Sequence, residues 1–298
     1  MEEIIYRDNK QDRIDCFMNK QCPGYSRTYF KNLIKSGKLF VNGKDVSPNY
    51  KLKISDKITY CLQDKPSFSM EPEDIPLDIV YEDDDIIVIN KQAGIVVHQS
   101  YGHEAGTLLN ALIYHLKNKS PFMVHRLDKD TTGAIIFAKN QKAKVSLSKQ
   151  FQKRTIHKIY VTAVCGIIQE DKGRIEAPLG RSQKNRKIIE VGPLAKKMAI
   201  TEFKVLARTN GITLLAVRII TGRTHQIRSH MKYIGHPVLG DAAYGGSQCL
   251  NGVVFNRQML HSYKIKFSHP CSGKTLELIA EIPNDMKNLF SFVNFYKI

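Results

Sequence analysis

The sequence has no C-x-x-C pair and no group of cysteine and histidine at the spacing of a zinc site. It has no apolar run near the roughly 18 residues that a membrane span needs, and its first residues lack the basic and apolar regions of a signal peptide. Nucleotide-binding and dinucleotide-binding motifs are absent as well. We therefore expect a cytoplasmic protein that holds no metal, with reduced and mostly buried thiols. Its six cysteines are dispersed along the chain: Cys16, Cys22, Cys61, Cys165, Cys249 and Cys271.

Acidic residues are scarce relative to basic ones. Lys and Arg number 45 against 28 Asp and Glu, a formal net charge of +17 that is spread along the whole chain. Such an excess favours a polyanionic partner, because each neutralised phosphate releases condensed counterions. The alternative is a solvated surface, or the composition of a lysine-rich organism. The hydrophobic content of 42% predicts a packed core, and 298 residues suffice for one large domain and one small one.

Residues 1–63 are predicted to form the small domain. Ser26 is a candidate helix N-cap, and Gly37 lies just past the expected end of that helix. The turn at Asn42-Gly43 has the composition of a type I′ hairpin. Basic residues recur every four positions on one helix face, which is either a solvated face or a binding surface: Arg27, Lys31 and Lys35.

Residues 64–76 carry three prolines among polar residues, which is the composition of a semi-rigid linker. Residues 77–298 then form the large domain, in which many hairpin signals predict strands. Helices are predicted at residues 107–117, 141–152 and 284–295. Lys91 follows a predicted strand, and we expect its side chain to be exposed, with a contact to a phosphate of the polyanionic partner as the alternative.

The central loop of the large domain reads HRLDKDTTG, residues 125–133. It lies between an apolar approach and the strand-like run at residues 134–138, a plausible place to present a reactive side chain. Arg126 is two residues from Asp128, so the two could pair. A polar turn that holds an Asp and a Gly for conformational reasons is the alternative, and the spacing alone does not decide between them.

A second charged stretch, residues 221–231, reads TGRTHQIRSHM. Two arginines and two histidines open a predicted short helix. His225 and His230 are five residues apart, off the i, i+4 pairing of helical metal ligands, and no third ligand is obvious. A metal site is therefore disfavoured. Tyr160 is the one large polar aromatic of the predicted strand at residues 158–166, which taken alone indicates a core or edge tyrosine.

The central loop resembles the H-R-L-D-x-x-T-S-G signature of the RluA/RluD-type pseudouridine synthases, with Thr132 where that family usually has Ser. This resemblance implies that Asp128 is the catalytic aspartate. Extrusion of the target base leaves a gap in the RNA stack, and Arg126 is the candidate to fill it.

Two further stretches extend the resemblance. The second charged stretch is similar to the family's G-R-T-H-Q-I-R-x-H, whose last arginine, Arg228 here, pairs with the catalytic carboxylate and orients it. Arg223 and His225 are then expected to support the loop or to touch phosphate. Lys158 and Tyr160 match a short K-x-Y motif, in which the tyrosine stacks on the target base.

The small domain resembles the S4-like RNA-binding domain in the order and spacing of its motifs, over about 50 residues. In that family the basic helix and the following turn contact the RNA backbone. The implied RNA-binding residues are Arg27, Lys31, Lys35 and Asn42.

The resemblance implies an α+β fold: a mixed, mostly antiparallel bent sheet with flanking helices, preceded by a small α/β S4-like domain. It implies isomerisation of uridine in RNA, most plausibly large-subunit ribosomal RNA, to pseudouridine by a monomeric enzyme without a cofactor. Two alternatives remain. One is a non-catalytic RNA-binding or ribosome-assembly factor. The other is a metal-dependent phosphodiesterase that uses Asp128, Asp130, Asp241 and the histidines.

Overall fold

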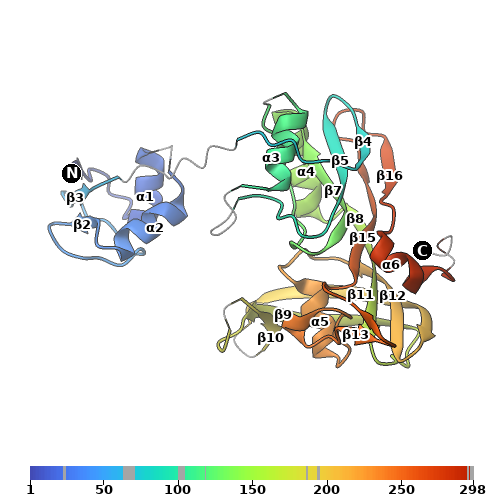
Figure 1. Cartoon of the computed structure of the whole chain (residues 1–298). Coiled ribbons are helices and arrows are strands. Elements are labelled where there is room, and N and C mark those ends of the chain that lie inside the picture. Colours follow the sequence, from blue (N-terminus) through green and yellow to red (C-terminus); the bar gives the residue numbers. More distant parts are fainter. Residues whose placement is uncertain are drawn as a thin grey trace. The chain divides into compact units, whose positions relative to one another are not determined.

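The computed structural model describes the chain except residues 23–24, 63–70, 100–104, 118, 186, 193–194, 294 and 296–298. The chain divides into two compact units, Met1–Phe68 and Ser69–Ile298 (Figure 1). Of the predicted linker, residues 64–70 lie outside the described residues, and residues 71–76 belong to the second unit. Within it, the Glu71 carbonyl accepts a hydrogen bond from Asn110 Nδ2 at 2.7 Å, and the Glu73 amide donates to the Asn110 carbonyl at 3.2 Å.

The first unit packs two helices against a small antiparallel sheet of order β1-β3-β2. Ser26 Oγ caps the second helix by accepting a hydrogen bond from the Tyr29 amide, as predicted. That helix buries Phe30, Leu33 and Ile34 in the core of the unit. The elements are β1 (Glu2–Ile5), α1 (Ile14–Gln21), α2 (Arg27–Lys35), β2 (Leu39–Val41) and β3 (Lys57–Tyr60).

The predicted turn at Asn42-Gly43 is present, with positive φ angles of 50° and 73° that suit a type I′ turn. It closes only the single bridge between Val41 and Lys44. Strand β2 pairs instead with β3, so the turn reverses the chain without building a long hairpin.

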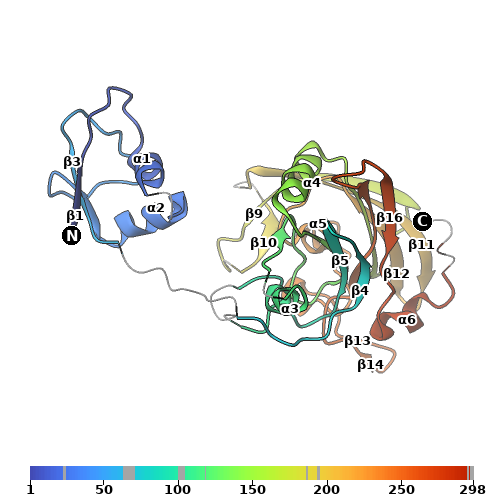
Figure 2. The same ribbon diagram turned by 90° about the horizontal axis from the view of Figure 1, so that it is seen from above.

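The second unit is built on an eleven-stranded sheet whose main path runs β10-β9-β11-β12-β8-β15-β7-β5-β4, with β16 beside β15 and β6 beside β7. Among the strands of the described residues, β15 and β7 pair in parallel and the other pairs are antiparallel. Seen from above, the strands curve round the unit rather than lie in one plane (Figure 2). The predicted mixed, bent sheet is confirmed. Its strands are β4 (Ile79–Glu82), β5 (Ile86–Lys91), β6 (Phe122–Met123), β7 (Thr132–Ala138), β8 (His157–Cys165), β9 (Lys172–Arg181), β10 (Ile189–Val191), β11 (Lys197–Thr209), β12 (Ile212–Ile219), β15 (Leu260–Ser268) and β16 (Thr275–Ile279). A separate ribbon joins β13 (Cys249–Leu250) and β14 (Val253–Val254).

Helices cover both faces of this sheet. Alternate residues of β5 and β7 divide between two cores: one includes apolar residues of α3 and α5, and the other includes those of α4. A third core packs α6 against β8 and β12. Two of these helices begin at side-chain caps: Thr107 forms a capping box at the start of α3, and Asn140 accepts from the Ala143 amide at the start of α4. The helices are α3 (Leu108–His115), α4 (Gln141–Lys153), α5 (Gln226–Tyr233), the 3₁₀ turn η1 (Ala242–Tyr244) and α6 (Asn284–Phe290).

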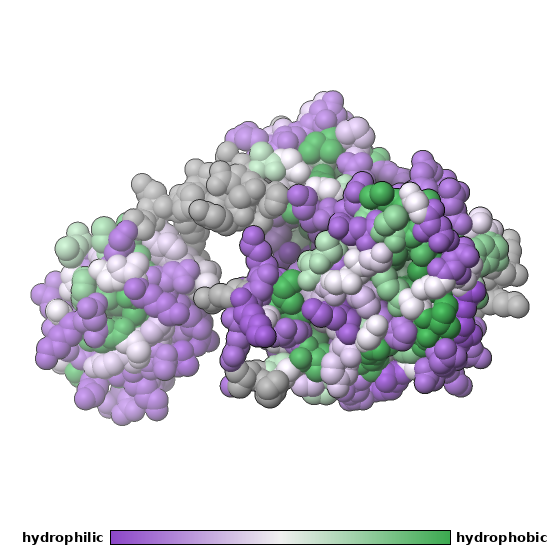
Figure 3. Space-filling view, turned by 60° about the horizontal axis from the view of Figure 1, so that its bottom comes forward, coloured by the Kyte–Doolittle hydropathy of each residue, from purple (hydrophilic) through white to green (hydrophobic). Residues whose placement is uncertain are grey.

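The face of the second unit that Figure 3 shows carries both polar and hydrophobic residues. On the face shown in Figure 3, hydrophilic residues predominate and hydrophobic ones form scattered groups between them. Within the described ranges, no helix is both long enough and apolar enough to cross a membrane.

Candidate active site

A cleft of about 520 Å³ brings together the two charged stretches and strand β8. Every residue that the sequence places in the catalytic site lines it, and so do the two residues of the second stretch that are expected to support the loop. They are Arg126, Asp128, Tyr160, Arg223, His225 and Arg228. These residues are distant in sequence, and the curvature of the sheet brings them to one place.

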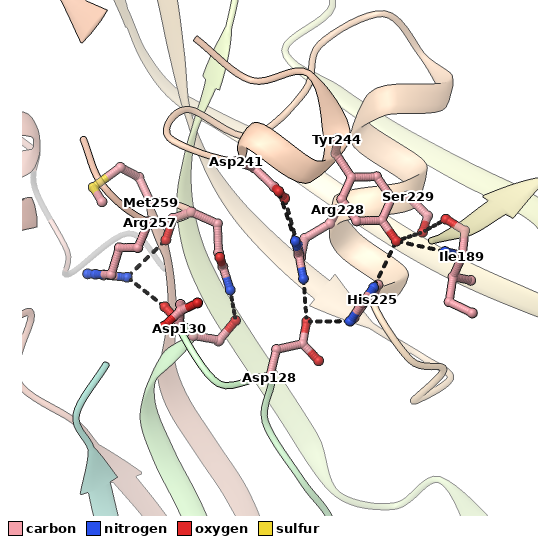
Figure 4. A network of polar contacts seen from close by, with 12 residues as sticks. Asp128, Asp130, Ile189, His225, Arg228, Ser229, Asp241, Tyr244, Arg257 and Met259 are labelled. Atoms are coloured by element: carbon pink, nitrogen blue, oxygen red, sulfur yellow. Dashed lines mark hydrogen bonds and ion pairs between the residues drawn. The ribbon is translucent and has the colours of Figure 1, made fainter. Parts of the chain in front are cut away.

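Asp128 lies on the loop that leads into β7, and its side chain is about one-fifth exposed, at 19%. The Asp128 carbonyl accepts a hydrogen bond from the Thr131 amide at 3.2 Å, and the neighbouring Leu127 is buried. Figure 4 shows the carboxylate directed toward Arg228 and His225. The Arg228 Nη1 atom is 3.3 Å from Asp128 Oδ2, and His225 Nε2 is 3.9 Å from the same oxygen.

Arg228 is itself held by a second carboxylate, that of Asp241. Arg228 Nε donates to Asp241 Oδ2 at 2.6 Å, and Nη2 donates to Oδ1 at 2.8 Å (Figure 4). Burial disfavours the charged guanidinium, but the bond to Asp241 outweighs burial and raises the pKa of Arg228 above its usual value. The bidentate pair fixes the guanidinium plane, which leaves Nη1 free to face Asp128. The sequence suggested Asp241 only as a residue of the metal-dependent alternative, so its bond to Arg228 was not predicted.

His225 sits at the N-terminus of α5 with a left-handed backbone, φ 51°. The Tyr244 hydroxyl accepts a hydrogen bond from the Ile189 amide at 3.0 Å, so its own proton is available to His225 Nδ1 at 2.8 Å. That arrangement places the imidazole proton on Nε2, which faces Asp128. Burial lowers the pKa of His225 more than the charge of Asp128 raises it, so the ring is neutral near pH 7.

Tyr160 lies on β8 with only 5% of its surface exposed, and it packs in the same core as Leu260 and Ile227. Burial raises the pKa of its phenol, and the charge of Asp128 acts in the same direction. The side chain is therefore a neutral aromatic wall of the cleft.

Comparisons with known proteins identify the fold and the family. A family model described as RNA pseudouridylate synthase matches residues 85–233, and an S4 domain model matches residues 12–58. An uncharacterised RNA pseudouridine synthase of Bacillus subtilis (strain 168) is 40% identical over 289 residues, covering 95% of this chain and 94% of that protein. The chain belongs to the RNA pseudouridylate synthase family.

Other relatives agree with this assignment. A ribosomal large subunit pseudouridine synthase D of Vibrio parahaemolyticus is 40% identical over 305 residues, covering 96% of this chain and 93% of that protein. The structure of human RNA pseudouridylate synthase domain containing 1 matches with a TM-score of 0.57 and 28% identity, over 69% of this chain and 83% of that one. The family, the α+β fold and the enzyme class inferred from the motifs are confirmed.

The prediction of an exposed Lys91 is wrong for this synthase. Lys91 is 1% exposed, and its Nζ donates to the carbonyls of Gln92, Ile95 and Lys129 at 2.8, 2.9 and 2.7 Å. Burial lowers its pKa to about 7, against the attraction of Asp130 and Asp128. Because Lys129 follows Asp128 directly, Lys91 ties the central loop to the end of β5.

Within the part of this synthase that the structure describes, the residues proposed for a metal-dependent alternative do not form a group of metal ligands, although His225 lies beside Asp128. His230 is fully buried, with Nδ1 2.9 Å from Thr201 Oγ1 and Nε2 3.3 Å from the Ala177 carbonyl. Among the described residues, the one group of potential metal ligands is Asp83, Asp85 and His269, and none of the three lines the cleft. His269 Nδ1 accepts from the Ser272 amide at 3.0 Å, so Nε2 carries a proton that Asp83 accepts at 2.8 Å.

In the S4 unit, two of the predicted RNA-binding residues also hold a buried carboxylate. Arg27 Nε is 3.0 Å and Lys31 Nζ is 3.7 Å from Asp15, whose side chain is fully buried, and Arg13 contacts it as well. Burial acts to raise the pKa of Asp15, but the bonds from Arg13 and Arg27 outweigh it and lower the pKa to about 2. Lys35 is exposed at the end of α2.

Asn42 has a structural role in the S4 unit that the sequence did not indicate. Its Nδ2 donates to Asp56 Oδ1 at 2.8 Å, and its Oδ1 accepts from the Lys57 amide at 2.9 Å. The side chain therefore locks the turn onto β3. Its contact with RNA stays a prediction.

Proposed function

We propose that this synthase converts specific uridines of large-subunit ribosomal RNA to pseudouridine, with Asp128 as the catalytic residue. The observation that carries the proposal is the chain Asp128–Arg228–Asp241 in a cleft walled by Tyr160. The choice of ribosomal RNA is supported by relatives that are named ribosomal large subunit pseudouridine synthase D.

The reaction breaks the C1′–N1 bond, rotates the base and forms the C1′–C5 bond, after which C5 loses a proton and N1 gains one. It neither oxidises nor hydrolyses the nucleotide, so it needs no electron or group carrier. Asp128 starts cleavage by attack on the sugar, by attack on the base or by removal of a sugar proton. Each route uses a free carboxylate in a fixed orientation, and Arg228 supplies that orientation.

The substrate must leave its stack to reach Asp128. Tyr160 offers a buried aromatic surface to the uracil, and Arg126, exposed at the cleft, is placed to enter the vacated position. Arg223 and the basic residues of the S4 unit, Arg27, Lys31 and Lys35, then contact the RNA backbone.

The test incubates the purified protein with unmodified large-subunit RNA and maps pseudouridine by carbodiimide-dependent reverse-transcriptase stops. Wild type is expected to produce stops that Asp128→Ala and Asp128→Asn do not. An Asp128→Asn protein that binds RNA as tightly as wild type separates chemistry from binding. Tight binding without stops in any RNA tested would favour a ribosome-assembly factor, and EDTA-sensitive shortening of the RNA would favour a phosphodiesterase.

A further inference from the structure

Lys158 is a buried lysine of the cleft whose amino group has no oxygen partner. It lies on β8, is 9% exposed and lines the cleft. Within the described parts of the chain, its Nζ makes no hydrogen bond or ion pair, and it faces the ring of Phe151 at 5.2 Å from the centroid. Burial alone lowers its pKa, to about 8.

The other buried cations of this unit are compensated. Lys91 donates to three carbonyls, Arg228 pairs with Asp241, and Arg257 pairs with Asp285 through Nε at 2.6 Å and Nη2 at 2.8 Å. Burying an unpaired charge is costly unless an ion or ligand completes the site. The buried ammonium group of Lys158 thus lacks the acceptor or anion that would compensate its charge.

A second buried donor without an acceptor lies beside the same phenylalanine. His125 Nε2 accepts a hydrogen bond from the Ile136 amide at 3.0 Å, so the proton of the neutral ring is on Nδ1. Nδ1 is buried and has no partner among the described residues. The His125 ring lies 4.8 Å from the Phe151 ring, and its pKa is lowered well below the usual value by burial and then by Lys158. Lys158 cannot donate to a nitrogen that already carries a proton.

The part of the cleft around Lys158 has an excess of positive charge. Of the residues that the structure describes, Asp128 is the one acid that lines the cleft, and it is paired with Arg228. Three more arginines line the same cleft, and Gly222 leaves space beside Lys158, since a Cβ there would lie 3.7 Å from Nζ. The arginines are Arg126, Arg154 and Arg223.

We propose that Lys158 binds a phosphate adjoining the target uridine and so acts as a substrate-positioning residue. This inference rests on the proposed function. Lys158 and Tyr160 are two residues apart on β8, so they project to the same side about 6.6 Å from one another. A base against Tyr160 therefore places its own backbone near Lys158. A phosphate oxygen compensates the ammonium charge, which a neutral uracil carbonyl does not.

The test uses a short RNA that wild type has been shown to modify at one uridine. Two further versions carry a neutral methylphosphonate in place of the phosphate on the 5′ or the 3′ side of that uridine. Lys158→Met is expected to raise KM by about ten- to a hundredfold with a smaller effect on kcat, because a hydrogen bond to a charged group is lost. For wild type, one of the two methylphosphonate RNAs should raise KM by a factor similar to that of the Lys158→Met substitution. The same RNA should leave the KM of Lys158→Met unchanged.

Two variants complete the design. Lys158→Arg restores the charge and should recover part of the lost affinity, and Lys172→Met removes an exposed lysine at the start of β9 and should leave KM unchanged. With wild type, KM should rise as the pH passes above about 8, while Lys158→Arg lacks that rise. Thermal unfolding shows whether each variant is folded.

The outcomes separate the two proposals. If both methylphosphonates weaken wild type and Lys158→Met alike, Lys158 does not bind phosphate, and the inference is wrong while the proposed function stands. An unchanged KM for Lys158→Met on unmodified RNA would also overturn it. If wild type forms no pseudouridine in any RNA, the proposed function fails and this inference fails with it.

Discussion

At the scale of single residues, the carboxylate proposed to be catalytic, that of Asp128, is held by a chain of three side chains. Asp128 and Arg228 are 100 residues apart in sequence, and Arg228 and Asp241 are 13 apart. The motifs predicted the first contact only through resemblance to a family. Nothing local predicted the second, because the partner of a buried guanidinium depends on how a later loop folds back over α5.

Asp241→Asn tests this dependence. The substitution keeps the volume of the side chain but removes the charge that fixes the Arg228 plane, so Arg228 can turn away from Asp128. We expect the single-turnover rate to fall by about a hundredfold, the usual cost of misplacing a catalytic group, with RNA affinity within about threefold of wild type. Asp171→Asn removes an acid that is 86% exposed in its pair with Arg208, and it serves as the control. An unchanged rate for Asp241→Asn would show that Arg228 needs no second carboxylate.

At the scale of elements, the sequence predicted helices better than loop anchors. The cap at Ser26 was predicted because it acts within three residues, and the caps at Thr107 and Asn140 act over the same short distance. The burial of Lys91 was missed because its partner carbonyl at Lys129 is 38 residues away, and a lysine after a strand is ordinarily exposed. The central loop is therefore predictable as a loop, but its attachment to β5 is not.

Gly133 shows that the central motif carries structure as well as chemistry. It lies where β7 meets β15 in parallel, with φ 107°, and a Cβ there would collide with the backbone of Ser262. Gly133→Ala is expected to destabilise the protein by more than about 2 kcal/mol and to lower activity by displacing the loop. The check is denaturant unfolding, with Gly211→Ala for comparison.

Gly211 also has a positive φ, 76°, but no atom would lie within 4 Å of a Cβ there. Gly211→Ala therefore measures the backbone strain alone, about 1 kcal/mol. Equal losses in the two variants would mean that the approach of Ser262 costs nothing extra.

In the S4 unit, two of the α2 residues that are proposed to bind RNA also support Asp15. Lys35→Gln should weaken RNA binding by about two- to threefold at constant stability, because it removes one exposed backbone contact. Arg27→Gln should lower both affinity and stability, since Arg27 is one of the residues that hold the buried Asp15. Filter binding at several salt concentrations and thermal unfolding measure the two effects. Loss of stability in Lys35→Gln, or unchanged affinity in both variants, would contradict this division of roles.

At the scale of the whole molecule, the order of strands explains why the site lies where it does. Strand β8 lies between β12 and β15. Strand β15 also pairs with β7, which follows the central loop. Tyr160 on β8 thereby lines the same cleft as Asp128. The sequence predicted the hairpins along this path, but the pairing of β15 with β7 joins segments 129 residues apart and includes the one parallel contact. Local patterns do not predict such a contact.

The same packing makes the protein sensitive to acid through its buried histidines. His261 bridges β15 to β7 and to Ala280, with Nδ1 2.9 Å from Thr132 Oγ1 and Nε2 3.1 Å from the Ala280 carbonyl. Burial lowers its pKa from 6.5 to about 4. Between these two pH values, His261 is protonated in the unfolded chain but neutral in the folded one. The stabilisation that His261 contributes is therefore complete above pH 6.5 and is lost as the pH falls toward about 4.

His261→Gln tests this contribution. The variant should be less stable than wild type at pH 7.5, because the amide replaces the ring contacts imperfectly. On acidification it should lose about 3 kcal/mol less of its unfolding free energy than wild type does over the titration range of His261. Denaturant unfolding at pH 7.5, 6, 5 and 4.5 gives the two slopes. His157→Gln, at the exposed start of β8, should follow the wild-type slope. Because His125, His225 and His230 also have lowered pKa values, the slope of His261→Gln should be reduced rather than abolished. A slope equal to that of wild type would mean that His261 is already protonated in the folded protein at pH 6.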